Sequence, residues 1–458
     1  MRLAFFSPFN PLKTGVADYS EELLPSLAEH SDVDLVVDRY ALSNPAIRDR
    51  FRVLTPAQFI AHADRYDMAV YQLANSVDQH GYMVPCMKHA PGITVLHDYY
   101  LHFLMLGLTL MKGDMPALKR TLSGKYGGSG SALAHRMLFG LFDPYQVSTT
   151  VPLVNMSRGV IMHSRFGERL VSEDAGAKPV RVVPMGIPIR PLLDPVAMKR
   201  KYNFADDSFV LASVSTLSHT KRIPTILQAV SRLRSRHPNL KLLILGGGKL
   251  GSHARGLIQS LDLSGTVRQT GWMPHDGYWE CLNLADAVID LRYPSGAETS
   301  ASLLRAMSAA KPVIASKQGS FLELPPDCSQ KISVGETETQ ELFEAVTRLI
   351  EDRSLTEQMG SASRRYVETH HRVDLAAQAY VEFIREVQQA PCTDPVEDWF
   401  SVAPNVISRT AYSSVYKLSR LVALLKNYGV SDTVRRLRAG TQRASRPETR
   451  EMSAGGGA

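Results

Sequence analysis

The chain of 458 residues has few cysteines and no long apolar run. Its four cysteines are Cys86, Cys281, Cys328 and Cys392. They have neither disulfide nor metal-ligand spacing, which is typical of a reducing compartment. No apolar run reaches the roughly 20 residues that a membrane-spanning helix needs. The short run Leu3–Phe6 is stopped by Pro8, so it is no signal peptide. We therefore expect a cytoplasmic protein.

The sequence also lacks the signatures of bound cofactors. It has no G-x-G-x-x-G fingerprint, so a nicotinamide or flavin dinucleotide is not indicated. It has no cluster of His, Cys and carboxylate residues with metal spacing, so we expect no cofactor and no essential metal. The net charge of +7 is modest for this length. It suits an anionic ligand or a membrane surface, and we expect no nucleic-acid partner.

Short apolar runs alternate with helical patterns, which favours parallel sheets with helices on both faces. The expected strands are Leu3–Phe6, Val33–Val37, Met68–Leu73, Ile93–Leu96, Gly159–His163, Val180–Pro184, Val210–Thr216, Lys241–Leu245, Ala287–Leu291 and Val313–Ser316. Expected helices include Tyr19–Ala28, Ile223–Arg236, Glu341–Asp352 and residues 361–388. Because the chain is too long for one core, we expect an α/β fold of two doubly wound, Rossmann-like domains facing a central cleft.

The series of strands restarts after residues 186–208, which are rich in proline and have no long apolar run. We therefore expect one domain over residues 1–190 and a second over residues 191–370. A helix over residues 371–390 would return toward the first domain. Residues 391–458 would form a basic tail, partly helical and partly disordered.

The tail combines an excess of arginine with one apolar periodic stretch. Arg435, Arg436, Arg438, Arg443, Arg446 and Arg450 are matched only by Asp432, Glu448 and Glu451. Tyr412–Tyr428 has apolar residues at helical spacing and predicts an amphipathic helix. This helix could lie peripherally on the inner face of a membrane, or dock on the protein itself or on a partner protein. We favour docking.

The segment Leu291–Ser320 carries polar groups just past an expected strand. Residues 294–297 break the strand, and Glu298, Thr299 and Ser300 stand where a helix would start. A simple explanation is a helix N-cap at Thr299 or Ser300. The free N–H groups of a helix start also favour phosphate, and α/β sheets bind ligands at this edge.

Polar residues follow other strands in the same way. Lys13 and Gly15 come after the first strand, and Asn75 after the third. His97 and Asp98 end the fourth strand. His97 could hydrogen-bond a sugar hydroxyl or stabilise developing charge, with Asp98 orienting its ring. The alternative is a half-buried histidine whose hydrogen bonds are satisfied within the fold.

In the second half, Thr216, Ser218, Lys221 and Arg222 gather hydrogen-bond donors and two cations where a strand meets a helix. Such a set can hold a diphosphate, and the alternative is a solvated charge pair. Gly246–Gly248 follow the next strand and permit either the close approach of a ligand or a tight turn.

Taken in order, these loops resemble those of the family 4 retaining glycosyltransferases (glycosyl transferases group 1), which have the GT-B fold. The resemblance covers residues 1–388. It rests on the segments TGVADYSEELLPSLA, TVLHDYYLH, GVIMHSRFGERL, VVPMGIP, STLSHTKRIPTILQAV, LKLLILGGG, GWMP and AETSASLLRAMSAAKPVIAS. It implies that the second domain binds a nucleotide-sugar donor and the first domain binds the acceptor.

The resemblance also implies roles for single residues. Lys221 would contact the donor diphosphate, His97 the transferred sugar, and Gly15 would let its loop approach the phosphate. The backbone near Trp272 and Met273 would meet the base. The further donor-binding residues are Thr216, Arg222, Gly247, Thr299, Ser300 and Arg305, and the acceptor-side residues are Asp18, Asn75 and Asp98.

The chain departs from the family pattern at two glutamates that usually stand seven residues apart. Ala297 occupies the first position and Arg305 the second, and an arginine cannot accept the protons of ribose hydroxyls. Thr216 replaces the arginine expected shortly before the lysine. Glu298 stands one residue late, and we expect it to take over the contact with the sugar hydroxyls.

The predicted function is transfer of a hexose from a nucleoside-diphosphate sugar to a saccharide, lipid-linked or small-molecule acceptor, with retention at the anomeric carbon. Lys221, Arg222 and the helix start near Thr299 would stabilise the leaving diphosphate. One alternative is another GT-B enzyme, such as a sugar-nucleotide epimerase. The other is a non-catalytic adaptor that binds a nucleotide sugar without turnover.

Overall fold

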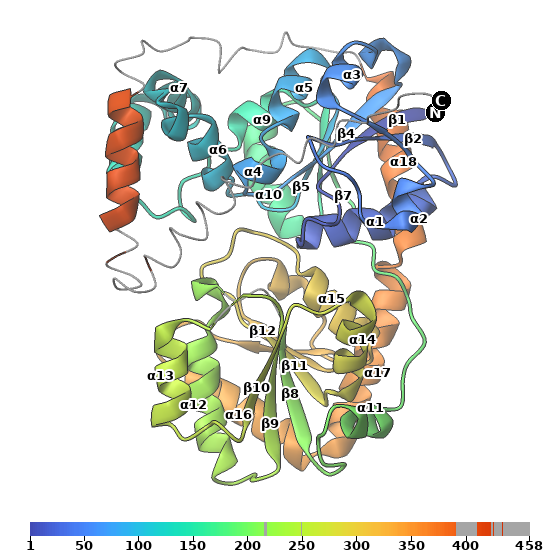
Figure 1. The fold of residues 1–458 in the computed structure, drawn as a ribbon, viewed down its shortest axis with the longest axis vertical. Coiled ribbons are helices and arrows are strands. Elements are labelled where there is room, and N and C mark those ends of the chain that lie inside the picture. The colour runs from blue at the N-terminus through green and yellow to red at the C-terminus, as the bar shows by residue number, and fades with distance from the viewer. Residues whose placement is uncertain (215–217, 249, 391–409, 423–424, 426–432, 434–458) are drawn as a thin grey trace, which may run out of the picture.

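The computed structural model describes the chain except for residues 215–217, 249, 391–409, 423–424, 426–432 and 434–458. Two parallel sheets lie one above the other, each covered by helices (Figure 1). The first sheet has the strand order β3-β2-β1-β4-β5-β6-β7. Its strands are β1 (Arg2–Phe6), β2 (Asp32–Val36), β3 (Arg52–Leu54), β4 (Met68–Leu73), β5 (Ile93–Leu96), β6 (Gly159–Met162) and β7 (Val180–Val182). The central strands are apolar and buried because helices cover both faces.

The helices of the first domain alternate with its strands. They are α1 (Gly15–Leu27), α2 (Pro45–Arg48), α3 (Pro56–Ile60), α4 (Val77–His80), α5 (Met83–His89), α6 (His102–Leu108), α7 (Met115–Tyr126), α8 (Gly130–Leu138), α9 (Val151–Asn155) and α10 (Arg165–Ala175). Helices α6 to α8 project to one side of the sheet (Figure 1). They have a hydrophobic cluster of their own, which includes Leu106, Leu118 and Met137.

The second sheet has the order β10-β9-β8-β11-β12-β13. Its strands are β8 (Phe209–Val214), β9 (Leu240–Leu245), β10 (Val267–Gly271), β11 (Ala287–Asp290), β12 (Val313–Ser316) and β13 (Ser329–Ile332). The helices that follow the first domain are α11 (Pro195–Lys201), α12 (Ile223–Arg234), α13 (Ser252–Ser260), α14 (His275–Leu284), α15 (Ala301–Ser308), α16 (Glu338–Glu351), α17 (Arg353–His370) and α18 (Val373–Gln389). The prediction of two doubly wound Rossmann-like domains is therefore confirmed.

Three strands were missed by the sequence analysis: β3, β10 and β13. All three lie at sheet edges, where one side of the strand has no neighbour. Their sequences, RVL, VRQTG and SQKI, are polar or mixed rather than continuously apolar. An edge strand is less buried than a central one, so it gives no apolar run to detect.

The prediction of one continuous helix over residues 361–388 is wrong. Helix α17 ends at His370 and α18 begins at Val373. At the break, Nδ1 of His371 donates to the carbonyl oxygen of Met185 at 3.0 Å. The backbone N–H of Ile187 donates to the carbonyl of His371 at 2.6 Å. Here the chain crosses back from the second domain, and α18 packs on α1 of the first. The hydroxyls of Tyr19 and Tyr380 lie 3.1 Å apart in that contact.

A helix over residues 410–422 overlaps the predicted amphipathic stretch Tyr412–Tyr428 and docks on the protein itself. Tyr416 is buried in the cluster of α6 to α8. The hydroxyls of Ser413 and Ser419 donate to the carbonyls of Met111 and Leu138, at 3.1 and 2.9 Å. The predicted arginine-rich end of the tail lies outside the described residues. Among the residues that are described, no helix is both long and apolar enough to cross a membrane.

Replacing Phe383 of α18 should test how strongly this helix holds the first domain. Phe383 is fully buried, so we expect Phe383→Ala to lower the free energy of unfolding by about 3 to 5 kcal/mol. Urea denaturation followed by circular dichroism measures the change. Leu375→Ala is the control, because Leu375 is 39% exposed on the same helix. Equal losses in both variants would show that α18 does not act through its buried face.

Candidate functional site

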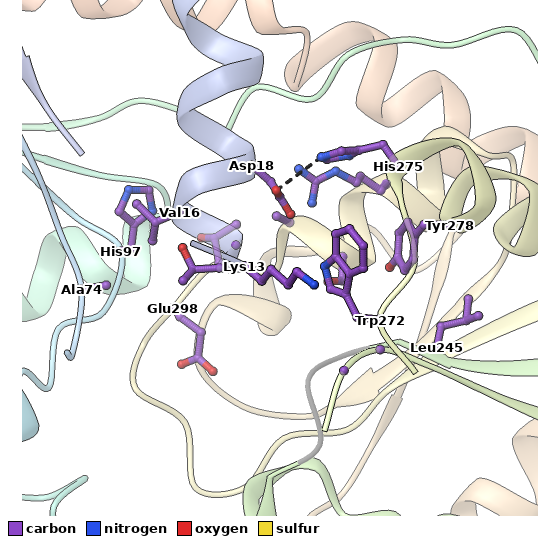
Figure 2. Close-up of a pocket in the computed structure, with 18 of the residues that line it drawn as sticks. Lys13, Val16, Asp18, Ala74, His97, Leu245, Trp272, His275, Tyr278 and Glu298 are labelled. Atoms are coloured by element: carbon purple, nitrogen blue, oxygen red, sulfur yellow. Dashed lines mark ion pairs between the residues drawn. The ribbon is translucent and has the colours of Figure 1, made fainter. Parts of the chain in front are cut away.

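A cavity of about 300 Å³ lies between the domains, where the carboxyl ends of both sheets meet. Figure 2 shows side chains of both domains converging on it. The first domain contributes Lys13–Val16, Asp18, Ala74, His97 and Asp98. The second contributes Leu245–Gly247, Gly271–Met273, His275, Tyr278, Arg292, Glu298, Thr299, Ala301, Ser302 and Arg305. These residues come from the ends and loops of six different strands, β1, β4, β5, β9, β10 and β11, which therefore form one site, as expected for parallel sheets.

The first loop closes the cavity over the second domain. Thr14 caps α1 by accepting a hydrogen bond from the N–H of Ala17 at 3.0 Å. This cap fixes the loop that carries Lys13 and Gly15. A Cβ atom at Gly15 would meet nothing within 4 Å, so the backbone is open to the cavity there. The ammonium of Lys13 lies 3.9 Å from the ring centroid of Trp272, a cation–π contact across the cleft.

Two ion pairs join α1 to the second domain beside this loop. Asp18 Oδ1 lies 3.3 Å from Nε2 of His275. The hydrogen bond to Asp18 raises the pKa of His275. Arg305 of α15 donates to both carboxylate oxygens of Glu22, with the shorter contact at 2.6 Å. Arg305 thus lines the cavity while its guanidinium is anchored to the opposite domain.

His97 lies at the cavity wall and is nearly buried. Its Nε2 is 2.7 Å from the amide oxygen of Gln72, so this nitrogen donates and Nδ1 is left as an acceptor. Burial, with the neighbouring His163, holds the pKa of His97 well below its ordinary value. A neutral imidazole in this position can accept a hydrogen bond from a hydroxyl but brings no charge.

Asp98 and Glu298 approach each other from the two domains. A Cβ atom at Gly296 would lie 3.3 Å from Asp98 Oδ1 and 3.2 Å from Glu298 Oε2, so both carboxylates border the same point. Burial, followed by the charge of Glu298, raises the pKa of Asp98 to about 7. Asp98 also accepts from the backbone N–H of Asn75 at 3.1 Å.

Asn75 itself points to α6 rather than into the cavity. Its side-chain oxygen accepts from the N–H groups of Phe103 and Leu104, at 2.6 and 3.2 Å. These are N–H groups of the first turn of α6, so Asn75 stabilises the start of that helix. Its effect on the site comes through its backbone contact with Asp98.

Arg292 forms the centre of the second domain's half of the site. Its guanidinium binds both oxygens of Asp290 at 2.9 and 3.1 Å, and Glu298 Oε1 at 2.8 Å. Nη2 also lies 2.5 Å from the hydroxyl of Ser300. Burial alone would raise the pKa of Glu298. The charge and hydrogen bond of Arg292 outweigh this effect and lower the pKa, so Glu298 is ionised.

Lys221 extends this cluster without lining the cavity wall. Its Nζ lies 3.3 Å from Asp290 Oδ1, and its side chain is only 12% exposed. Burial, together with the charge of Arg292, lowers the pKa of Lys221 to about 8. Lys221 and Arg292 therefore share one carboxylate, Asp290, so any change at one of these cations alters the field at the other.

The start of α15 offers hydrogen-bond donors to the cavity. Ser300 is the N-cap of α15, accepting from the N–H of Leu303 at 3.3 Å. Thr299 has a buried hydroxyl with no hydrogen-bond partner among the described residues, and it lines the cavity. Gly247 and Met273 face the same space from the loops after β9 and β10.

Arg222, a predicted donor-binding residue, does not line the cavity. Arg222 has a left-handed backbone with φ 53°, and its Nε donates to Glu338 at 2.9 Å. Glu338 is buried at the start of α16, so this pair joins α12 to α16. Thr216 lies outside the described residues.

The sequence analysis did not name Arg292, His275 or Tyr278 as site residues. It placed Lys13 and Trp272 in loops near the site but gave their side chains no role. Arg292 follows β11 just as His97 follows β5, so the strand-end rule could have found it. His275 and Tyr278 stand on α14, where their spacing looks like that of any surface helix. Only the pairing of α14 with α1 across the cleft reveals them.

The substitution Asp98→Asn should remove a pH-dependent loss of stability. Asp98 has a pKa of about 7 in the folded chain against an ordinary 3.8, so its protonated form stabilises the fold at low pH, and this contribution is lost as pH rises toward 7. The amide of the variant has no proton to lose. We therefore expect the Tm of Asp98→Asn to rise relative to wild type between about pH 4 and 7.

Differential scanning fluorimetry across this range measures the difference in Tm. Asp64→Asn is the control, because Asp64 is an exposed carboxylate of the same domain. It reports the effect of the same substitution at an exposed position away from the cavity. A Tm difference for Asp98→Asn that is constant over the range would contradict the raised pKa.

Comparison with known proteins adds sequence relatives for the second domain. Residues 196–366 match the family described as glycosyl transferases group 1. The chain is 28% identical over 179 residues to a lipopolysaccharide 1,2-N-acetylglucosaminetransferase of Salmonella typhimurium, covering 37% of this chain and 46% of that protein. It is 24% identical over 191 residues to an alpha-D-kanosaminyltransferase of Streptomyces kanamyceticus, covering 42% and 48%. The chain spans about half the length of these curated relatives.

Solved structures extend the likeness to both domains. HepE of Anabaena, crystallised with UDP and glucose, superposes with a TM-score of 0.61 at 17% identity, covering 84% of this chain and all of that one. At this identity the likeness concerns the fold. The second domain thus matches glycosyl transferases group 1, and the two domains together have the GT-B fold.

Proposed function

We propose that this protein is a glycosyltransferase that moves a hexose from a nucleoside-diphosphate sugar to an acceptor hydroxyl, with retention at the anomeric carbon. One observation carries the proposal: the cavity between the domains joins buried cations, hydroxyl-binding carboxylates and the start of α15. The named transferase activities of the sequence relatives support it. So does a structural neighbour crystallised with UDP-glucose. Retention rests on the resemblance to family 4.

The diphosphate would lie against the start of α15. There the N–H groups of the first turn and the orphan hydroxyl of Thr299 face the cavity. A helix start favours anions, and Lys13 on the opposite wall adds a positive charge. Arg292 and Lys221 would stabilise the charge that develops on the diphosphate as the bond to the sugar breaks. We expect no essential metal, because these groups supply the positive charge.

The sugar would lie between Glu298 and His97. Glu298 is ionised and can accept hydrogen bonds from hydroxyls, while neutral His97 offers Nδ1 as an acceptor. In the reaction the anomeric carbon loses its bond to the diphosphate oxygen and gains one to the acceptor oxygen. The acceptor proton would leave with the nucleoside diphosphate.

The acceptor would approach from the first domain, beside Asp98. We propose a saccharide, lipid-linked or small-molecule acceptor. We further propose a cytoplasmic location, with the tail in peripheral contact with the inner face of a membrane or with a partner protein. Within the described part of the tail, the helix over residues 410–422 is the segment that would make this contact.

Lys221→Ala and Glu298→Ala should each lower turnover at least tenfold, about 1.4 kcal/mol of transition-state stabilisation. A thermal-shift panel of UDP, GDP and ADP sugars identifies the donor, and release of nucleoside diphosphate with an acceptor measures turnover. Lys317→Ala is the matched control, because Lys317 is exposed just after the neighbouring strand β12. It should keep the wild-type rate.

The outcome also separates the alternatives. Release of nucleotide and sugar without any acceptor would favour an epimerase-type enzyme. A thermal shift without turnover by any donor would favour a non-catalytic adaptor. Wild-type rates in both Lys221→Ala and Glu298→Ala would overturn the assignment of this site.

The nucleoside end of the cavity supports a specific role for Asp18. Arg305 offers only donors and is held by Glu22, so it cannot accept from a ribose diol. Asp18 is a carboxylate on the wall beside His275 and Tyr278, near the loop with Trp272 that would meet the base. A carboxylate is the usual partner of ribose hydroxyls in Rossmann-like sites. We therefore place Asp18 on the ribose rather than on the acceptor.

Binding of a ribonucleoside diphosphate and its 2′-deoxy analogue tests this role. The wild type should prefer the ribonucleotide by about tenfold or more, the value of a hydrogen bond to a charged group. Asp18→Asn should lose most of this preference in isothermal titration calorimetry. Asp276→Asn, beside His275 but 83% exposed, should keep it. An undiminished preference in Asp18→Asn would exclude the ribose contact.

A further inference from the structure

The helical lobe, which we define as residues 102–142, 410–422 and 425, differs in charge from the rest of the chain. It contains seven Lys or Arg and one Asp, a formal charge of +6 out of +7 for the whole protein. The basic residues are Lys112, Lys119, Arg120, Lys125, Arg136, Lys417 and Arg420. Its acid, Asp114, is buried and caps α7 by accepting from the N–H of Ala117. Within these bounds the lobe therefore presents no acidic side chain, although exposed Asp143 follows it directly and Lys125 is paired with Asp174 outside it.

Exposed apolar side chains are concentrated on the same lobe. Among the described residues sixteen large apolar side chains are exposed, and eight of them lie here. They are Phe103, Met111, Phe139, Leu141, Val415, Leu418, Val422 and Leu425. Single exposed apolar residues are ordinary, but such a concentration marks an interaction surface.

The tail helix shows how this surface is built. Its inner side packs through Tyr416 on α6 to α8. Val415, Leu418, Val422 and Leu425 follow at spacings of three and four residues, so they form one stripe. Leu418 is 62% exposed and Val422 is 56% exposed, so the stripe is not used for docking on the protein.

We infer that the helical lobe is a docking surface for an anionic lipid bilayer. A bilayer interface accepts apolar side chains into its acyl boundary and attracts the surrounding lysines and arginines to its headgroups. A second copy of this chain fits poorly, because two basic lobes would face each other. A nucleic acid would use the charge but leave the apolar stripe in water.

The position of the lobe next to the cavity gives membrane docking a function. Helix α6 begins four residues after Asp98, so the lobe leaves the first domain directly from the cavity wall. Figure 1 shows α6 between the sheet of the first domain and the tail helix. A bilayer under the lobe would bring membrane-held hydroxyl compounds near the first-domain side of the cavity. The inference rests on the membrane contact proposed above for the tail, whereas vesicle binding is measured without donor or acceptor and so is independent of transferase activity.

Vesicle sedimentation with the full chain tests the inference. Wild type should bind vesicles of phosphatidylcholine with phosphatidylglycerol, bind neutral vesicles more weakly, and lose binding as salt is raised. Leu418→Glu/Val422→Glu should lower the partition coefficient for anionic vesicles at least about tenfold, since it removes two apolar anchors and adds two negative charges.

Leu192→Glu/Val196→Glu is the matched control. It changes the same residue types at the same spacing, at positions that are 49% and 38% exposed outside the lobe. This control should bind like wild type, and circular dichroism should show both variants folded. Light scattering should show the same oligomeric state for all three proteins.

Three results would overturn the inference. One is a wild type that does not sediment with anionic vesicles. Another is equal binding by the lobe variant and its control. The third is a wild-type oligomer that dissociates in the lobe variant, which would assign the surface to a second copy of the chain.

Discussion

The buried guanidinium of Arg292 is the interaction on which the site depends. Its contacts with Asp290, Glu298 and Ser300 tie the end of β11, the loop after it and the start of α15 into one unit. A buried charge is tolerated only with such partners, and removal of one partner leaves the others uncompensated. The loop conformation, the ionisation of Glu298 and the orientation of α15 therefore follow from one residue.

The same loop reaches the first domain. The carbonyl of Gly296 accepts from the N–H of Tyr99 at 2.8 Å, and Ala297 packs into a hydrophobic cluster of the first domain. Glu323 accepts from two N–H groups at the start of α10, so a second loop also crosses. Because the walls of the cavity belong to both domains, the site described here exists only when the domains are together.

The sequence allowed prediction of the parts that depend on local pattern. Central strands are apolar over several residues, and His97, Glu298 and Ser300 were found because they follow such strands. Edge strands such as β10 lack that pattern. The partners of Arg305 and His275 could not be predicted, since Glu22 and Asp18 lie in the other domain, far away along the chain. Arg222 was predicted to bind the donor because of its charge. Its partner Glu338, which holds it elsewhere, lies far along the sequence and could not be predicted either.

The two chain crossings between the domains lie together, and this limits how the domains can move. The first crossing passes Ile187 and the second passes His371, and a backbone hydrogen bond joins these two residues. Two connections fastened at one place behave as a single hinge, whereas two separate connections would resist rotation. A swing about this point would open the cleft and part the contact between Lys13 and Trp272 that crosses it.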